Sequence, residues 1–153
     1  MKAHCLVRLQ KANETGDIIN ELKTNRPSDP VIVKYLIQVF NDLGQYSEST
    51  QLLEYALTMS LDNEELCEEL FFAYVREGKL LKQQNQALQL YKTFQRDIHA
   101  LWAVESMYLI SLNLKFETKI LDIAYLLMLK LMKEPLFTID KKFIMLYIKI
   151  LSK

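Results

Sequence analysis

The sequence predicts an all-α fold in which pairs of amphipathic helices stack side by side. Three glycines and three prolines in 153 residues are too few for the many turns of an all-β fold. Apolar residues recur at helical spacing, most clearly where Leu66, Leu70 and Tyr74 precede Gly78. Half of the residues are hydrophobic and a quarter are charged, which is typical of a folded globular chain.

About nine helices are expected along the chain, and local breaks set their ends. Gly16, Gly44 and Gly78 end helices, and Pro135 stops the longest one. Pro30 disfavours helix at the residue before it but suits the first turn of the helix that follows. The expected helices cover residues 1–14, 18–22, 31–43, 98–112, 116–133 and 141–151, with three more between Ser47, a predicted cap, and Phe94.

A repeat relates two of these helix pairs. Gly44 and Gly78 are 34 residues apart, and each follows large apolar residues at the same three spacings. A period of 34 residues in a helix-turn-helix pattern is the signature of tetratricopeptide repeats. We therefore expect one domain over 1–153 that forms a right-handed α-α superhelix. Its expected units are about 1–29, 30–61, 62–96 and 97–134, with a partial unit over 135–153.

Charge and hydropathy exclude several classes of function. Nineteen basic and nineteen acidic residues cancel, although 41–76 holds eight acids against Arg76 alone and 115–153 holds eight lysines against four acids. Neither segment is dense or aromatic enough to predict nucleic-acid binding. The most apolar run, 123–129, is far shorter than the roughly 20 residues that span a bilayer. We expect no membrane association and a soluble, cytoplasmic protein.

The side chains that carry chemistry form no catalytic or metal-binding pattern. Cys5 and Cys67 lie in apolar helical patterns, so both are expected to be reduced packing residues. His4 and His99 do not complete a metal-ligand spacing with them. The isolated glycines form no phosphate-binding loop. The sequence therefore predicts no cofactor, no metal and no enzyme activity. The helix dipole favours acidic residues near the start of a helix, which explains the four acids Glu64, Glu65, Glu68 and Glu69.

Two segments, residues 70–94 and 101–113, carry a family resemblance, and they read LFFAYVREGKLLKQQNQALQLYKTF and LWAVESMYLISLN. They resemble the auxiliary, non-catalytic subunit of the NatB N-terminal acetyltransferase complex. In that family an LFFAYVR-type helix closed by glycine precedes a helix with KKQQ and ALxLYK, and a WxVxS helix follows. The matching residues here are 70–78, 82–92 and 101–106. Leu81 and Leu101 depart from the family pattern, which has lysine and an aromatic residue there.

The resemblance implies a scaffold subunit that binds the catalytic acetyltransferase subunit of NatB, with the ribosome as a further partner. That complex acetylates nascent chains that begin with methionine followed by Asp, Glu, Asn or Gln. Family members are several times longer, so we expect a short member or a partial sequence. The alternative is a generic tetratricopeptide adaptor for protein–protein interaction. An enzyme is a third hypothesis, without a motif to support it.

Candidate partner-binding residues come from repeat geometry and from the family motif. First helices build the inner wall of such solenoids, and two sets of residues would line it: Val31, Lys34, Gln38, Asn41 and Asp42; and Glu65, Glu68, Phe72, Val75 and Arg76. The acidic members favour a helical or basic protein surface as the ligand. The motif adds Lys82, Gln83 and Gln84, for which ordinary solvent exposure is the alternative. The partner-binding residues predicted in this way are Glu65, Glu68, Phe72, Arg76, Lys82, Gln83 and Gln84.

Other aromatic residues are expected to pack in the core. Tyr74, Tyr91 and Trp102 fall at helical spacing and should wedge neighbouring helices together. The last expected helix, 141–151, is apolar nearly all round, so a single neighbour cannot cover it. Exposed apolar faces of this kind indicate a protein interface or missing sequence.

Overall fold

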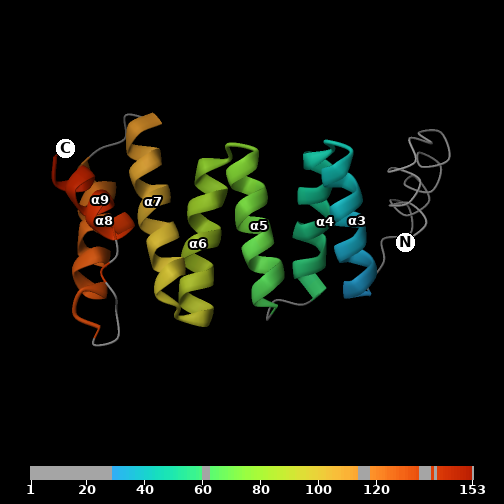
Figure 1. The fold of residues 1–153 in the computed structure, drawn as a ribbon, viewed down its shortest axis with the longest axis horizontal. Helices are drawn as coiled ribbons and strands as arrows, with labels where there is room; N and C mark the ends of the chain where they lie inside the picture. The colour runs from blue at the N-terminus through green and yellow to red at the C-terminus, as the bar shows by residue number, and fades with distance from the viewer. Residues whose placement is uncertain (1–28, 60–62, 114–117, 135–138, 140, 153) are drawn as a thin grey trace. The chain divides into compact units, whose positions relative to one another are not determined.

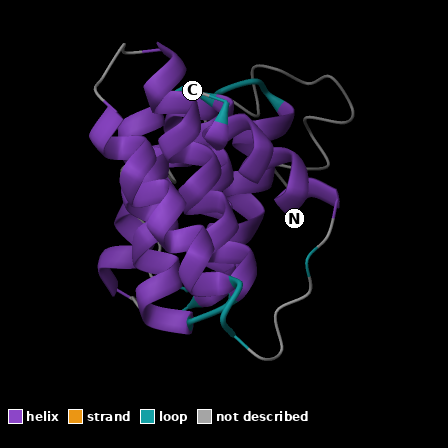
Figure 2. Cartoon of the chain, turned by 90° about the vertical axis from the view of Figure 1, so that its left-hand side faces the viewer, coloured by secondary structure: helices purple, strands orange, loops and turns teal. Residues whose placement is uncertain are grey.

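A computed structural model describes residues 29–59, 63–113, 118–134, 139 and 141–152 (Figure 1). The helices within these ranges are α3 (Pro30–Asp42), α4 (Tyr46–Met59), α5 (Glu64–Arg76), α6 (Leu80–Phe94), α7 (Asp97–Asn113), α8 (Thr118–Leu131) and α9 (Lys141–Leu151). The described part of the chain contains helices and no strand (Figure 2). The all-α prediction is therefore confirmed for these residues.

The described residues hold seven helices, whereas nine were expected over the whole chain. The two helices expected over 1–14 and 18–22, and Cys5 with them, lie outside the described residues. The last expected helix agrees with α9 at both ends. The helix expected to be the longest, 116–133, is wrong at its end, because α8 stops at Leu131 and Lys133 N–H bonds to the Lys130 carbonyl in a tighter turn. Among the described helices α7 is the longest, with 17 residues.

Helix starts follow local capping chemistry. The Asp29 carboxylate accepts a hydrogen bond from Val31 N–H at 2.8 Å, and a proline occupies the first turn of α3, as expected. Asn63 Oδ1 accepts from Leu66 N–H at 3.1 Å and caps α5. The cap predicted at Ser47 is wrong, because α4 already begins at Tyr46 and Ser47 lies inside its first turn.

Both repeat glycines end helices in the left-handed region of backbone conformation. Gly44 follows α3 with φ of +70°, and Gly78 follows α5 with φ of +67°. A Cβ at either glycine would meet no atom within 4 Å, so space is not what requires glycine there. The backbone angle is the requirement, because L residues with a side chain rarely adopt it.

We expect Gly44→Ala to lower the free energy of unfolding by about 1–2 kcal/mol, which is the steric cost of the left-handed conformation for a residue with a Cβ. Chemical denaturation followed by far-UV circular dichroism measures the change. Asparagine tolerates this conformation better, so Gly44→Asn should lose less than Gly44→Ala. An alanine variant as stable as the parent chain would show that the turn relaxes to another conformation.

The chain divides into two compact units, Met1–Glu77 and Gly78–Lys153. In the first unit α4 packs against both α3 and α5 (Figure 1). Its core is apolar, and its buried side chains include Val33, Leu36, Ile37, Val39, Phe40, Leu52, Leu53, Ala56, Leu57, Leu66, Leu70 and Phe71. Cys67 of α5 is buried too, as expected for a packing residue. The assignment of 1–153 to one domain and the unit boundaries stay predictions.

In the second unit α7 packs against α6, α8 and α9. The buried residues that α7, α8 and α9 contribute to its core are Ala100, Val104, Met107, Ala124, Met128, Leu131, Phe143 and Ile150. A polar chain of hydrogen bonds crosses between α6 and α7 inside this unit. Gln83 Nε2 donates to Ser106 Oγ at 2.9 Å, and Ser106 Oγ donates to the Trp102 carbonyl at 2.7 Å. Gln83 and Ser106 are both buried.

The three aromatic residues expected in the core differ in their burial. Tyr74 is buried, and its hydroxyl donates to Glu54 Oε1 at 2.7 Å. Burial, with help from this hydrogen bond, raises the pKa of the Tyr74 phenol. Tyr91 is half-buried, and the Lys130 ammonium lies 5.5 Å from the centre of its ring. Trp102 is half-buried as well. The core prediction is therefore confirmed for Tyr74 and holds only in part for the other two.

Candidate functional site

A groove of about 370 Å³ opens on the first unit, between side chains of α3 and α5. Its lining residues are Lys34, Ile37, Gln38 and Asn41 from α3, Leu53 from α4, and Glu69, Phe72 and Arg76 from α5. Five of these eight are residues that repeat geometry assigned to the inner wall. The first helices of two successive pairs thus supply the walls, and α4, which packs against both, supplies a buried leucine.

Helical spacing explains why these side chains share one surface. On α3 the lining residues follow an i, i+3, i+4, i+7 pattern, and on α5 Glu69, Phe72 and Arg76 are three and four residues apart. Glu69 is the functional candidate that the sequence did not reveal. The acidic run at the start of α5 suggested a helix-dipole role, yet Glu69 lies four residues after Glu65 and three before Phe72. That spacing is the signal that could have placed it on the wall.

Two cations at the groove already have partners within the first unit. Lys34 Nζ donates to Glu65 Oε1 at 2.5 Å, and this hydrogen bond raises the pKa of Lys34. The Arg76 guanidinium lies 4.9 Å from the centre of the Tyr46 ring, in a cation–π arrangement. Both contacts are made with residues that do not line the groove.

Two of the residues that line the groove each hold a side-chain oxygen that is closed off from solvent. Asn41 Oδ1 and Glu69 Oε2 are buried atoms, and neither has a hydrogen-bond partner among the described residues. Burial raises the pKa of the Glu69 carboxyl, while the charges of Lys34 and Arg76 oppose the shift. The lining holds no cysteine or histidine, so its chemistry is that of charge, hydrogen bonding and apolar contact.

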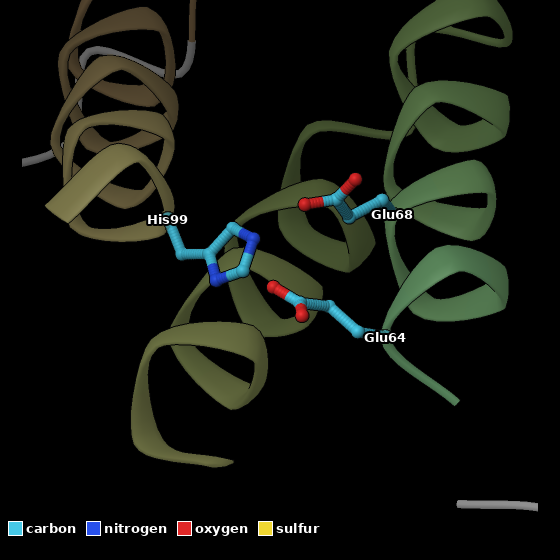
Figure 3. A group of neighbouring side chains, drawn as sticks. All are labelled: Glu64, Glu68 and His99. Atoms are coloured by element: carbon cyan, nitrogen blue, oxygen red, sulfur yellow. The ribbon is translucent and has the colours of Figure 1, made fainter. Parts of the chain in front are cut away.

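The candidate residues on α5 lie at or beside this groove. Glu65 is exposed and pairs with the lining residue Lys34. Phe72 is 50% exposed, and its ring lies 5.2 Å from that of Phe71 in a T-shaped arrangement. Glu68 is half-buried and does not line the groove. Figure 3 shows Glu64 and Glu68 one helical turn apart on α5, and Glu64 lies in the first turn, where the helix dipole favours an acid.

The candidates on α6 belong to the second unit and differ from one another. Lys82 is exposed and Gln84 is half-buried. Gln83 is only 4 % exposed, and its amide bonds to Ser106 inside the unit, so the surface position expected for it is wrong. His99 lies on α7 (Figure 3) and is buried, with its ring 5.2 Å from that of Trp102. The partner-binding role of the exposed candidates stays a prediction.

A second groove, of about 360 Å³, lies between α7 and α9 in the second unit. Its lining residues are Ile98, Leu101, Trp102, Glu105, Lys142, Phe143, Met145, Leu146 and Lys149. Large apolar residues of α9 are also exposed, namely Ile144, Met145, Ile148 and Leu151. The exposure of these side chains agrees with the expectation that a single neighbouring helix cannot cover α9. Among the described residues no helix has both the length and the apolar character required to cross a bilayer.

Comparison with known proteins places the whole chain in one kind of repeat region. The family model described as "Psidin, N-terminal TPR repeats region" matches residues 1–153. The phagocyte signaling-impaired protein of Drosophila pseudoobscura pseudoobscura is 29% identical over 107 residues, which is 70% of this chain and 11% of that protein.

Relatives that carry a different name have a similar level of sequence identity. N-alpha-acetyltransferase 25, NatB auxiliary subunit, of Mus musculus is 28% identical over 138 residues, or 88% of this chain and 14% of that protein. The protein of the same name from Homo sapiens gives the same identity and coverage. The chain thus spans between 11% and 14% of the length of these relatives.

Proposed function

Because the chain belongs to the family of the Psidin N-terminal tetratricopeptide repeats, we propose that it is a non-catalytic scaffold that binds the catalytic subunit of a NatB-type N-terminal acetyltransferase. The similarity to proteins named as NatB auxiliary subunits, over 88% of this chain, carries the proposal. In this role the chain supports cotranslational acetylation, in the cytoplasm and close to the ribosome, of nascent chains that begin with methionine followed by Asp, Glu, Asn or Gln.

The geometry is that of a surface which holds other proteins. Each unit carries a groove between helices, and α9 exposes a row of large apolar side chains. Helical repeats bind partners through such extended surfaces, with rigid helices presenting the contact residues. The scaffold positions the partner, and the partner catalyses the acetyl transfer.

Affinity purification of the tagged chain from its own cells tests the proposal. We expect an acetyltransferase to co-purify, and the purified fraction to acetylate a peptide that begins with Met-Asp in preference to the same peptide beginning with Ser-Asp. The chain purified alone should transfer no acetyl group from acetyl-CoA. A purified complex without acetyltransferase activity would reject the proposal, and turnover by the chain alone would favour an enzyme.

A generic protein–protein interaction adaptor is the second candidate function. The observation that favours it is a comparable identity, 29% over 70% of this chain, to a relative whose name refers to phagocyte signalling. Recovery of a defined set of partners that contains no acetyltransferase would support the adaptor. The same purification therefore distinguishes the two functions.

A further inference from the structure

The groove of the second unit is lined by two helical stripes with the same spacing. The α7 stripe consists of Ile98, Leu101, Trp102 and Glu105, and the α9 stripe consists of Lys142, Met145, Leu146 and Lys149. Both follow the i, i+3, i+4, i+7 pattern that places side chains on one face of a helix. Such a stripe extends over roughly 10 Å of helix axis, so the two stripes match about two turns of a third helix laid along them.

The middle of both stripes is apolar and only partly covered. Met145 is 50% exposed and Ile98 is 41% exposed, while Leu101, Trp102 and Leu146 are half-buried. A groove between two helices with apolar side chains along it is the kind of surface on which an amphipathic helix docks its apolar face. The apolar lining therefore favours a helical ligand.

Charge indicates which helix fits. The sequence of α9, KKFIMLYIKIL, contains lysines and no acid. Two of these lysines, Lys142 and Lys149, line the groove two helical turns apart, and both are exposed. Neither is held by an ion pair to another described residue. Glu105 is the one acid of the lining, so two cations face one anion. A ligand with negative charge on the side that faces α9 complements this arrangement.

Two other occupants fit the same groove less well. A second copy of this chain, docked face to face about a two-fold axis, would bring lysine-flanked surfaces together, and α9 offers no acid to pair with them. An anionic lipid surface would attract Lys142 and Lys149 but would also bring negative charge toward Glu105. An acidic helix can turn its charged flank to α9 alone.

We propose that this groove binds an amphipathic helix of a partner protein, with acidic residues on one flank that pair with Lys142 and Lys149. The apolar stripe of that helix packs between α7 and α9. Glu105, on the α7 side, repels acids there and so selects which flank of the ligand faces α9. This inference deepens the scaffold function and rests on it only for the protein nature of the ligand.

A designed peptide tests the proposal without any acetyltransferase. The probe is acetylated and amidated Ala-Ala-Glu-Leu-Ala-Ala-Leu-Leu-Ala-Glu-Leu-Ala-Ala, whose leucines form one stripe and whose glutamates lie two turns apart on one flank. Two further peptides carry glutamine or lysine in place of both glutamates. Trp102 lines the groove and is the one tryptophan of the sequence, so its fluorescence in the full chain reports on binding.

We expect the glutamate peptide to shift the Trp102 emission and to bind about tenfold more tightly than the glutamine peptide, as two partly exposed ion pairs imply. The lysine peptide should bind more weakly than either. In 1 M NaCl the screening length falls to about 3 Å, so the advantage of the glutamate peptide should largely disappear.

Variants assign the effect to the groove. Lys142→Gln and Lys149→Gln should each weaken binding of the glutamate peptide about threefold, and the control Lys133→Gln should not, because Lys133 is exposed but does not line the groove. Met145→Ala should weaken the glutamate and glutamine peptides alike, about fivefold, through lost apolar contact. Its control is Met132→Ala, since Met132 is 44% exposed and lies outside the lining. Circular dichroism shows whether each variant is folded.

Three results with peptides would overturn the proposal: equal binding of the glutamate and glutamine peptides at low salt, equal effects of Lys142→Gln and Lys133→Gln, or no response of Trp102 to any peptide. Two further results would assign the face to another occupant and overturn it as well. One is a dimer in sedimentation that Met145→Ala abolishes, which indicates a second copy. The other is binding to vesicles of equal parts phosphatidylcholine and phosphatidylserine without a response to peptides, which indicates a lipid surface.

Each of these failures leaves the scaffold function standing, since no catalytic subunit takes part in the titration. Conversely, a failure to co-purify an acetyltransferase would not change the outcome with peptides. The two proposals therefore fail separately.

Discussion

Leu131→Ala is expected to lower the free energy of unfolding of the second unit by about 2–5 kcal/mol, the range for deleting a buried leucine side chain. Leu131 is 0% exposed and belongs to the core that α7, α8 and α9 share. The loss combines the transfer of apolar surface with the cavity left behind. Trp102, the one tryptophan of the sequence, lies on α7, so its fluorescence during urea unfolding reports on this unit.

The matched control for this variant lies on the same helix. Leu126 of α8 is 63% exposed, so Leu126→Ala makes the same chemical change without opening a cavity. We expect it to change the free energy of unfolding by less than about 0.5 kcal/mol. Equal losses from the two variants would show that the core is not where the buried side chains place it.

Ser106→Ala is expected to lower the free energy of unfolding by about 1–3 kcal/mol, the cost of leaving a buried polar group without its partner. Ser106 accepts from the Gln83 amide and donates to the Trp102 carbonyl, so its loss removes the centre of a buried chain of hydrogen bonds. The Gln83 amide would remain in the interior with one donor unsatisfied. The same fluorescence measurement follows the change.

A double-mutant cycle tests whether the two side chains act together. Gln83→Leu combined with Ser106→Ala replaces both polar groups, so the double variant should lose less than the sum of the single ones, by about 0.5–3 kcal/mol. Gln89→Leu is the control, because Gln89 is an exposed residue of the same helix. Strictly additive losses would contradict the direct hydrogen bond.

Local chemistry explains why much of the fold could be predicted. The proline and the Asp29 cap set the start of α3, Asn63 sets that of α5, and the two repeat glycines set helix ends through backbone angles alone. Each signal acts within a few residues, so one sequence is enough to find it. The start of α4 was misplaced because serine caps only when the chain before it is not already helical, and α4 begins at Tyr46.

The candidate site could be predicted only in part, because polar residues on inner faces look like surface residues in a sequence. Gln83 lies four residues before Ala87 on the buried face of α6, yet its partner Ser106 is 23 residues away. Glu69 was likewise assigned to the exposed start of a helix. Repeat positions did place Lys34 and Glu65 on one wall, where they pair across 31 residues. The positions of the other candidate side chains depend on contacts with residues far away in the sequence, and helical periodicity does not reveal those contacts.

The half-buried carboxyl of Glu69 carries a desolvation cost, which is seen in its raised pKa. A methionine at this position would fill similar space without a partly desolvated charge. An engineer who sought a heat-resistant version of this chain would therefore begin at Glu69.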